Sequence, residues 1–70
     1  MVTYMVPYDV YAAIRDNHQM RDADVAKTAG VNPSTFSDWK SGRSTPKLDK
    51  LRKIAAVLGV TVDDLIEEAS

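Results

Sequence analysis

The chain has 70 residues and contains no cysteine, only one histidine and no long hydrophobic run. Without cysteine there are no disulfides or thiolate metal sites, so we expect helix packing alone to hold the fold, in a chain compatible with a reducing cytoplasm. Because no second ligand residue lies at a suitable spacing, His18 indicates helix-end structure rather than a metal ligand or general base. Pro7 and Asp9 interrupt the apolar N-terminal stretch, so we expect neither a signal peptide nor a membrane span.

Groups able to carry out catalysis are also scarce. A chain of this length forms one small domain with a modest core, so an enzyme would need its whole site within a small surface. No nucleophile lies at a spacing that would pair it with a base. We therefore expect one domain over residues 1–70, with residues 1–7 as an N-terminal extension, and no enzyme, cofactor, metal or small-molecule substrate. Four carboxylates near the C-terminus are expected on a solvated helix face: Asp63, Asp64, Glu67 and Glu68.

The charges are distributed unevenly along the chain. The formal net charge is −1, which alone disfavours nucleic acid, because contacts to phosphates supply most non-specific affinity. Between residues 40 and 53, however, there are six cations and one anion, whereas both flanking segments are acidic. We therefore expect a polarised molecule. The six cations, called the basic block below, are Lys40, Arg43, Lys47, Lys50, Arg52 and Lys53.

Residues 22–41 have the spacing of two short helices that meet at a tight turn. Val25 and Ala26 lie in the first helix, and Ala26 is small where the second helix would cross. Gly30 can adopt the left-handed conformation that ends a helix without a Cβ penalty. This arrangement indicates a helix-turn-helix.

The second helix of this pair has one apolar and one polar face. Asn32 can cap it, and Pro33 suits its first turn, where the missing N–H is not needed. Phe36 and Trp39 lie three residues apart and form the inner face. An outward row of short polar side chains can enter a DNA major groove. The row consists of Ser34, Ser37, Asp38 and Ser41.

Helix boundaries can be predicted around this pair. We expect a first helix after Pro7 and Tyr8 that ends near residue 17. The second and third helices are expected over residues 22–29 and 33–40. A loop is then expected over residues 41–46. The last four cations of the basic block follow it: Lys47, Lys50, Arg52 and Lys53.

Two more helices are expected after the loop. Thr45 and Pro46 suit the cap and first turn of a fourth helix, which Gly59 ends. Thr61 begins a fifth helix, and Asp64 completes a capping-box-like pair with it. The fourth helix has an apolar stripe made of Leu48, Leu51, Ile54, Ala55 and Leu58. The predicted fold is therefore all-α, with five helices in one domain.

From about residue 11 to residue 68, the chain resembles the phage repressor and Cro-type (XRE-like) helix-turn-helix family. The ordered set of motifs, rather than any single one, makes the resemblance specific. It implies a five-helix, repressor-like DNA-binding domain that docks its third helix in the major groove of double-stranded DNA. The residues that carry it are Val25-Ala26, Gly30-Val31, Phe36, Ser37-Asp38-Trp39, Gly42-Arg43, Pro46, Leu51, Ile54-Ala55, Leu58-Gly59-Val60 and Leu65.

The resemblance also implies which residues contact DNA. Together with the outward row, it predicts that base edges are read by Pro33, Ser34, Thr35, Ser37 and Asp38. The resemblance predicts phosphate contacts for the backbone near Asp22 and for Ser41, Arg43, Ser44 and Thr45. Phosphate contacts are also predicted for Lys40 and Lys47, because they lie close to the expected groove. Lys50, Arg52 and Lys53 lie opposite the apolar stripe, where an ordinary solvated face is expected.

Two residues depart from the family pattern. Members often have glutamine at the position of Asp22, and an aspartate there suits the helix dipole but repels phosphate. Members commonly have glutamate at the position of Lys40, where it pairs with the arginine that corresponds to Arg15. Here either Arg15 finds another carboxylate, such as Asp38 or Asp16, or both cations turn toward DNA.

Several interpretations remain open from the sequence. Asp38 could accept a hydrogen bond from cytosine, exclude DNA or pair with Arg15. The apolar segment of residues 1–8 either packs over the fifth helix, is frayed, or forms a dimer contact or arm. The favoured function is a cytoplasmic, sequence-specific transcriptional regulator, a bacterial or phage repressor, acting as a possible homodimer on a pseudo-palindromic operator. The alternative is an antitoxin-like or regulatory protein-interaction module that docks a basic protein through Asp22, Asp24 and Asp38.

Overall fold

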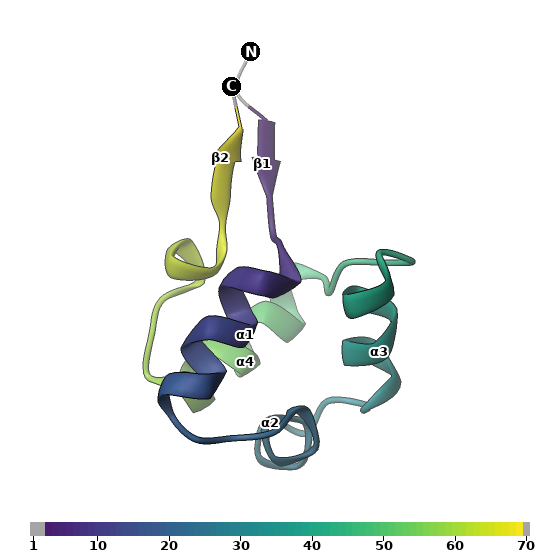
Figure 1. The fold of residues 1–70 in the computed structure, drawn as a ribbon, viewed down its shortest axis with the longest axis vertical. Coiled ribbons are helices and arrows are strands. Elements are labelled where there is room, and N and C mark those ends of the chain that lie inside the picture. The colour runs from purple at the N-terminus through teal and green to yellow at the C-terminus, as the bar shows by residue number, and fades with distance from the viewer. Residues whose placement is uncertain (1–2, 70) are drawn as a thin grey trace.

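The structure, a computed structural model, describes the backbone of residues 3–69 and the side chains of residues 6–66. A helical body carries two short strands that project side by side from one end (Figure 1). None of the helices in these residues is long and apolar enough to cross a membrane. The elements are β1 (Thr3–Met5), α1 (Tyr8–Asn17), α2 (Asp22–Ala29), α3 (Ser34–Ser41), α4 (Leu48–Leu58), the 3-10 helix η1 (Val62–Leu65) and β2 (Glu67–Ala69).

The prediction of five helices is correct for the first four and wrong for the fifth. Thr61 and Asp64 form the predicted capping box, with Asp64 N donating to Thr61 Oγ1 at 3.3 Å and Thr61 N donating to Asp64 Oδ2 at 3.0 Å. The helix that follows is a single 3-10 segment, because Ile66 is already extended. The chain then leaves the helical body as β2, which lies beside β1 (Figure 1).

The two strands also correct the all-α prediction. β1 and β2 pair antiparallel, with Thr3 opposite Ala69 and Met5 opposite Glu67. Part of the predicted N-terminal extension thus pairs with the chain that follows η1. At the end of the apolar segment of residues 1–8, Val6 and Tyr8 pack against the core, and the interpretation of this segment as a dimer contact or arm stays a prediction.

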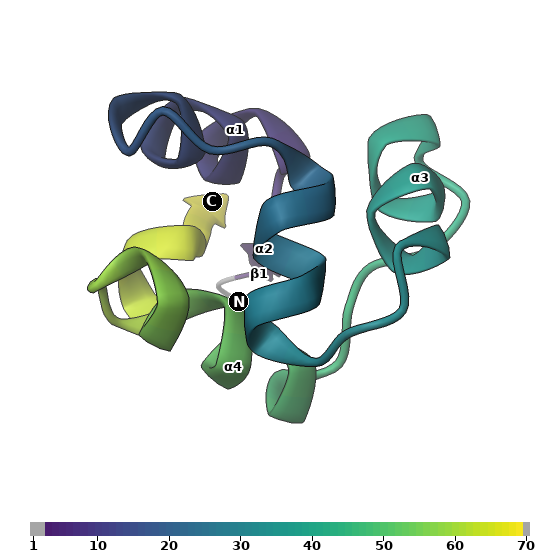
Figure 2. The same ribbon diagram turned by 90° about the horizontal axis from the view of Figure 1, so that it is seen from below.

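The helix-turn-helix boundaries agree closely with the prediction. α2 has the predicted bounds, and Gly30 ends it in the left-handed conformation with φ 71°. α3 begins at Ser34, one residue later than predicted, although Pro33 already has helical dihedral angles. Gly42 ends α3 with φ 80°. α2 and α3 lie next to each other when the molecule is viewed from below (Figure 2).

The start of α4 differs from the prediction. Thr45 and Pro46 do not cap it; Pro46 is buried in the loop, and Lys47 occupies the cap position. Leu48 was predicted on the apolar stripe but is 52% exposed, because it lies in the first turn, beyond the elements that cover the rest of the stripe. The stripe that is buried begins at Leu51.

The core joins all four helices and η1. α2 and η1 pack against α4, and α1 packs against α3. This packing fixes the orientation of α3, the helix on which the predicted base-reading residues lie. The buried core residues are Tyr11, Val25, Ala26, Val31, Phe36, Trp39, Leu51, Ile54, Ala55, Leu58 and Leu65.

Candidate nucleic-acid interface

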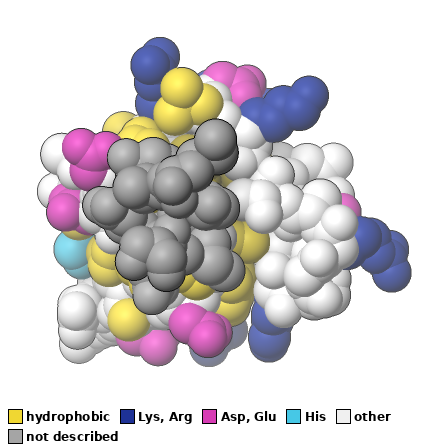
Figure 3. Space-filling view, turned by 90° about the horizontal axis from the view of Figure 1, so that it is seen from above, with side chains coloured by type: hydrophobic (Ala, Val, Ile, Leu, Met, Phe, Trp, Pro, Cys, Tyr) yellow, Lys and Arg dark blue, Asp and Glu magenta, His cyan; other side chains and the backbone are white. Residues whose placement is uncertain are grey.

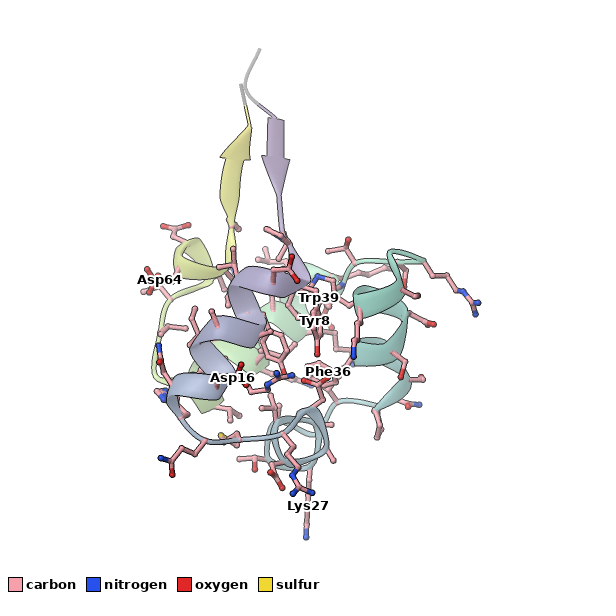
Figure 4. All side chains as sticks on the ribbon, in the orientation of Figure 1. Tyr8, Asp16, Lys27, Phe36, Trp39 and Asp64 are labelled. Atoms are coloured by element: carbon pink, nitrogen blue, oxygen red, sulfur yellow. The ribbon has the colours of Figure 1, made fainter. Side chains whose placement is uncertain are left out.

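The inner face of α3 is anchored by aromatic side chains. Phe36 and Trp39 are buried, as predicted, and lie with Tyr8 between α1 and α3 (Figure 4). The Trp39 ring stacks on Tyr11 with 4.8 Å between centroids, and Tyr8 meets Trp39 edge-on at 5.6 Å. Trp39 Nε1 also donates a hydrogen bond of 2.7 Å to the Val6 carbonyl. With this face fixed against the core, the opposite face of α3 is held toward solvent.

The predicted base-reading residues lie together on the outer side of α3. Pro33, Ser34 and Ser37 are exposed, whereas Thr35 and Asp38 are partly buried. All five come from one turn-and-helix segment, so a single groove could meet them. Their role in reading bases stays a prediction.

The start of α3 is closed by Asn32, in the capping role predicted for it. Its Oδ1 accepts hydrogen bonds from the Ser34 backbone N–H and the Ser34 hydroxyl, both at 3.0 Å. The sequence interpretation gave Asn32 no further role. The paired side chains of Asn32 and Ser34 are both exposed at the N-terminal end of the helix.

The end of α3 is organised around the Asp38 carbonyl. It accepts hydrogen bonds from the Arg43 N–H at 2.8 Å, the Ser44 N–H at 3.3 Å and the Ser41 hydroxyl at 3.1 Å. The Asp38 carboxylate lies 3.9 Å from Arg43 Nη1, and the Arg43 side chain is 80% exposed. The turn therefore holds the Arg43 backbone firmly while its guanidinium stays accessible. An ion pair this exposed contributes little to stability.

Arg15 forms an internal ion pair, which answers the question left open by the sequence. Its Nη1 donates to Asp22 Oδ1 at 2.6 Å and to the Tyr8 hydroxyl at 2.9 Å. The Tyr11 hydroxyl donates to Asp22 Oδ1 at 2.7 Å, and the Tyr8 hydroxyl donates to Asp22 Oδ2 at 2.5 Å. Asp16, one of the two suggested partners, also bonds Arg15, at 2.9 Å.

Two interpretations of Arg15 are therefore wrong. Asp38, the other suggested partner, faces Arg43 instead, and Arg15 does not turn toward solvent, since only 17% of its side chain is exposed. The pairing missed from sequence is Arg15 with Asp22, which joins α1 to the first residue of α2. The two departures from the family pattern are thus linked, because Asp22 supplies the carboxylate for Arg15 that the family commonly has at the position of Lys40. Within the described side chains, no ion pair joins Lys40 to a carboxylate.

The electrostatics of this cluster keep Asp22 ionised. Burial raises the pKa of the Asp22 carboxyl, but hydrogen bonds from Tyr8, Tyr11 and Arg15 outweigh burial, and the pKa lies below its ordinary value. Burial raises the pKa of the Tyr11 hydroxyl, and its bond to Asp22 acts in the same direction. The Asp22 charge is therefore compensated by Arg15 at neutral pH, so it repels a nearby anion less than an unpaired carboxylate would.

The remaining predicted phosphate-binding residues lie from the end of α3 through the loop to α4. Lys40, Ser41, Arg43, Ser44, Thr45 and Lys47 are all exposed. Lysine and arginine side chains also project from the rim of the molecule seen from above, including the edge beyond α3 (Figure 3). Cations thus lie directly beside the outer face of α3, and phosphate binding by these residues stays a prediction.

His18 links two helix ends. Its Nε2 forms a hydrogen bond with the Leu58 carbonyl at the end of α4. His18 directly follows α1 and caps it. This contact confirms the expectation of a structural role at a helix end.

The chain matches the model of a known family and is similar in sequence to known regulators and repressors. A family model described as helix-turn-helix matches residues 12–65. HTH-type transcriptional regulator DdrOP3 of Deinococcus deserti is 35% identical over 77% of this chain and 42% of its own length. The 26 kDa repressor protein of Escherichia phage HK022 is 44% identical over 59% of this chain and 17% of its own length. The cryptic phage CTXphi transcriptional repressor RstR of Vibrio cholerae is 27% identical over 80% of this chain and 50% of its own. The chain thus spans half or less of each relative.

Solved structures show the same architecture. A "putative DNA-binding protein" from Bacteroides fragilis superposes with a TM-score of 0.70 at 28% identity, covering 96% of this chain and all of that one. A transcriptional regulator from Listeria innocua gives a TM-score of 0.71, covering 91% of this chain and 59% of that one. At 19% identity the second similarity supports the fold alone.

Proposed function

The chain belongs to the helix-turn-helix family, and we propose that it is a sequence-specific double-stranded DNA-binding transcriptional regulator, a repressor of bacterial or phage type. The observation that carries this proposal is the contrast between the two faces of α3. Its inner face is buried in the core through Phe36 and Trp39, while its outer face presents short polar side chains directly beside exposed cations. A rigid helix with this surface matches what a major groove accepts.

In the proposed complex, positioning and reading are divided between two sets of groups. Specificity comes from Pro33, Ser34, Thr35, Ser37 and Asp38 on α3. Affinity comes from phosphate contacts by the exposed cations Lys40, Arg43 and Lys47, aided by Ser41, Ser44 and Thr45 and by the backbone N–H of Asp22. In the unbound chain the Ser41 hydroxyl donates to the Asp38 carbonyl, so it must rotate away from this bond to donate to a phosphate.

The Asp22 cluster allows the start of α2 to approach a phosphate. The positive N-terminal end of a helix attracts an anion such as a phosphate, but an unpaired Asp22 carboxylate there would repel it. Here Arg15 and the hydroxyls of Tyr8 and Tyr11 occupy both carboxylate oxygens. The carboxylate points into the cluster, and the repulsion expected from sequence is reduced.

We propose that operator binding involves two copies of the chain. The reading residues are mostly serine and threonine, whose single hydrogen bonds discriminate weakly, so one domain alone should bind poorly. A homodimer on a pseudo-palindrome, with half-sites about 34–36 Å apart, would add the two contributions.

The alternative, docking of a basic protein, is less well supported. It depended on Asp22, Asp24 and Asp38 as a shared acidic surface. Asp22 is paired with Arg15, Asp24 accepts the Arg21 N–H at 3.0 Å, and Asp38 faces Arg43. Each of the three carboxylates thus has a group of this chain beside it.

A salt titration of two matched variants tests the proposal. Arg43→Ala and Lys53→Ala each remove one exposed cation, but only Arg43 lies beside α3; Lys53 lies on α4. Arg43→Ala should weaken binding to all duplexes and reduce the slope of log affinity against log salt by roughly one unit. Lys53→Ala should leave the slope unchanged. Equal slopes for both variants and the parent would contradict the assignment of this surface.

A further inference from the structure

The capping contact at the start of α3 defines which atoms of Asn32 and Ser34 face outward. The Ser34 backbone N–H can only donate, so the atom of Asn32 that faces it must be the amide oxygen. The same oxygen lies 3.0 Å from Ser34 Oγ, and this contact requires the hydroxyl hydrogen between two acceptors. The directions of both hydrogen bonds therefore follow from chemistry alone.

These two bonds leave a defined set of groups on the surface. The amide oxygen of Asn32 already accepts two hydrogen bonds, whereas its amide nitrogen keeps two N–H donors. Within residues 6–66, this nitrogen donates no hydrogen bond. The Ser34 hydroxyl hydrogen is already donated to Asn32, so Ser34 Oγ can act only as an acceptor. Both side chains are exposed at the end of α3 that reaches base edges in helix-turn-helix complexes. The cap thus presents a donor beside an acceptor.

Only one base offers the complementary pair in the major groove. Adenine has the N7 acceptor beside the N6 amino donor, guanine has two acceptors, cytosine has a donor, and thymine has an acceptor and a methyl group. An asparagine usually reads adenine with both ends of its own amide. Asn32 cannot do so while its oxygen caps the helix.

We infer that Asn32 and Ser34 act together as one reader of an adenine, with the Asn32 amide donating to N7 and Ser34 Oγ accepting from the N6 amino group. This inference rests on the proposed DNA binding and adds Asn32 to the reading residues. Because the cap holds both side chains before DNA arrives, little side-chain freedom is lost on binding. Ser34 then acts as an acceptor, not as a donor.

Base analogues test the two bonds separately. Duplexes are selected from a random pool with the unmodified protein, and each adenine of the preferred site is replaced in turn by 7-deazaadenine, which lacks N7, or by purine, which lacks the amino group. At one adenine, both replacements should weaken binding by about five- to tenfold, the share of one bond in a bidentate pair.

Protein variants then assign each bond to a residue. Asn32→Ser keeps a capping oxygen but loses the amide donors, so it should bind the natural and 7-deazaadenine duplexes equally. Ser34→Ala should become insensitive to the purine replacement. Thr28→Ala, which removes an exposed hydroxyl from α2, should keep both sensitivities. Thermal melting of each variant checks that the fold is retained.

The outcomes separate this inference from the proposed function. If the unmodified protein binds selected duplexes but no adenine shows both sensitivities, or if Asn32→Ser keeps the full N7 sensitivity, the adenine reader is wrong and DNA binding stands. If the unmodified protein binds no duplex, the proposed function is wrong and the adenine reader falls with it.

Discussion

Replacing Asp22 by asparagine should destabilise the domain because it removes the charge that compensates Arg15. An asparagine side chain in the same position could still accept from Tyr11 and Arg15 through its oxygen, so packing changes little. The substitution removes charge-assisted hydrogen bonds to the Arg15 side chain, which is only 17% exposed. Arg15 then keeps Asp16, whose side chain is 68% exposed, as its remaining carboxylate partner. We expect a loss of about 1.5–3 kcal/mol in the free energy of unfolding at pH 7.

That loss is large for a chain of this size. A domain of 70 residues has a total stability of roughly 4–10 kcal/mol, so Asp22→Asn should lower the melting temperature by about 6–24 °C. Urea unfolding followed by circular dichroism measures the difference. Asp16→Asn is the matched control, and because Asp16 is exposed it should cost less than about 1 kcal/mol.

The pH dependence of the difference identifies its cause. The pKa of Asp22 is lowered in the folded chain, so its stabilisation is present above the ordinary carboxyl pKa and is lost as pH falls through the folded value. The difference between the parent and Asp22→Asn should therefore be constant near neutral pH and shrink below about pH 4. A difference that stays the same from pH 7 to pH 3, or one below about 0.5 kcal/mol at pH 7, would refute this account of the cluster.

Three further changes test the packing that holds α3. Ala26→Leu should destabilise the domain by about 1–3 kcal/mol in urea unfolding, because Ala26 is 2% exposed and extra methylenes would overfill the core; an unchanged midpoint would show that this site has room. Trp39→Phe removes the donor to the Val6 carbonyl and should cost at least about 1 kcal/mol, seen as a lower melting temperature. Gly42→Ala meets no neighbouring atom but requires φ 80°, so a loss of about 1 kcal/mol is expected; a neutral result would mean that the end of α3 relaxes.

Local patterns predicted the helix-turn-helix well. Gly30 after an apolar-small pair, and Phe36 and Trp39 at a spacing of three, depend only on neighbours along the chain. These signals gave the bounds of α2 and the inner face of α3, and the structure confirms both. The Thr61 and Asp64 capping box was likewise correct, because its two bonds span three residues.

Features that depend on distant contacts could not be predicted in the same way. The pairing of β1 with β2 joins residues more than 60 positions apart, and β2 begins where the predicted fifth helix would have continued beyond η1. Leu48 has the periodicity of a core residue, but whether its turn is covered depends on the other helices. These are properties of the assembled fold rather than of any one segment.

The Arg15 partner shows the same limit within the candidate site. Several carboxylates were within reach in principle, and only the placement of α1 against α2 selects Asp22. Two tyrosines then complete the cluster from α1. A signal was present in the sequence, since the changes at Asp22 and Lys40 together move the expected carboxylate from the third helix to the second.

The most direct test of the central claim is a titration of the unmodified chain with two duplexes at about 50 mM salt, where phosphate contacts are strongest. One duplex carries the sequence enriched from a random pool, and the other carries the same bases in shuffled order. If the outer face of α3 reads DNA, the selected duplex should bind at least about a hundredfold more tightly, the effect of two or more mismatched base pairs. Equal binding of the two duplexes, or no binding to either, would contradict the claim.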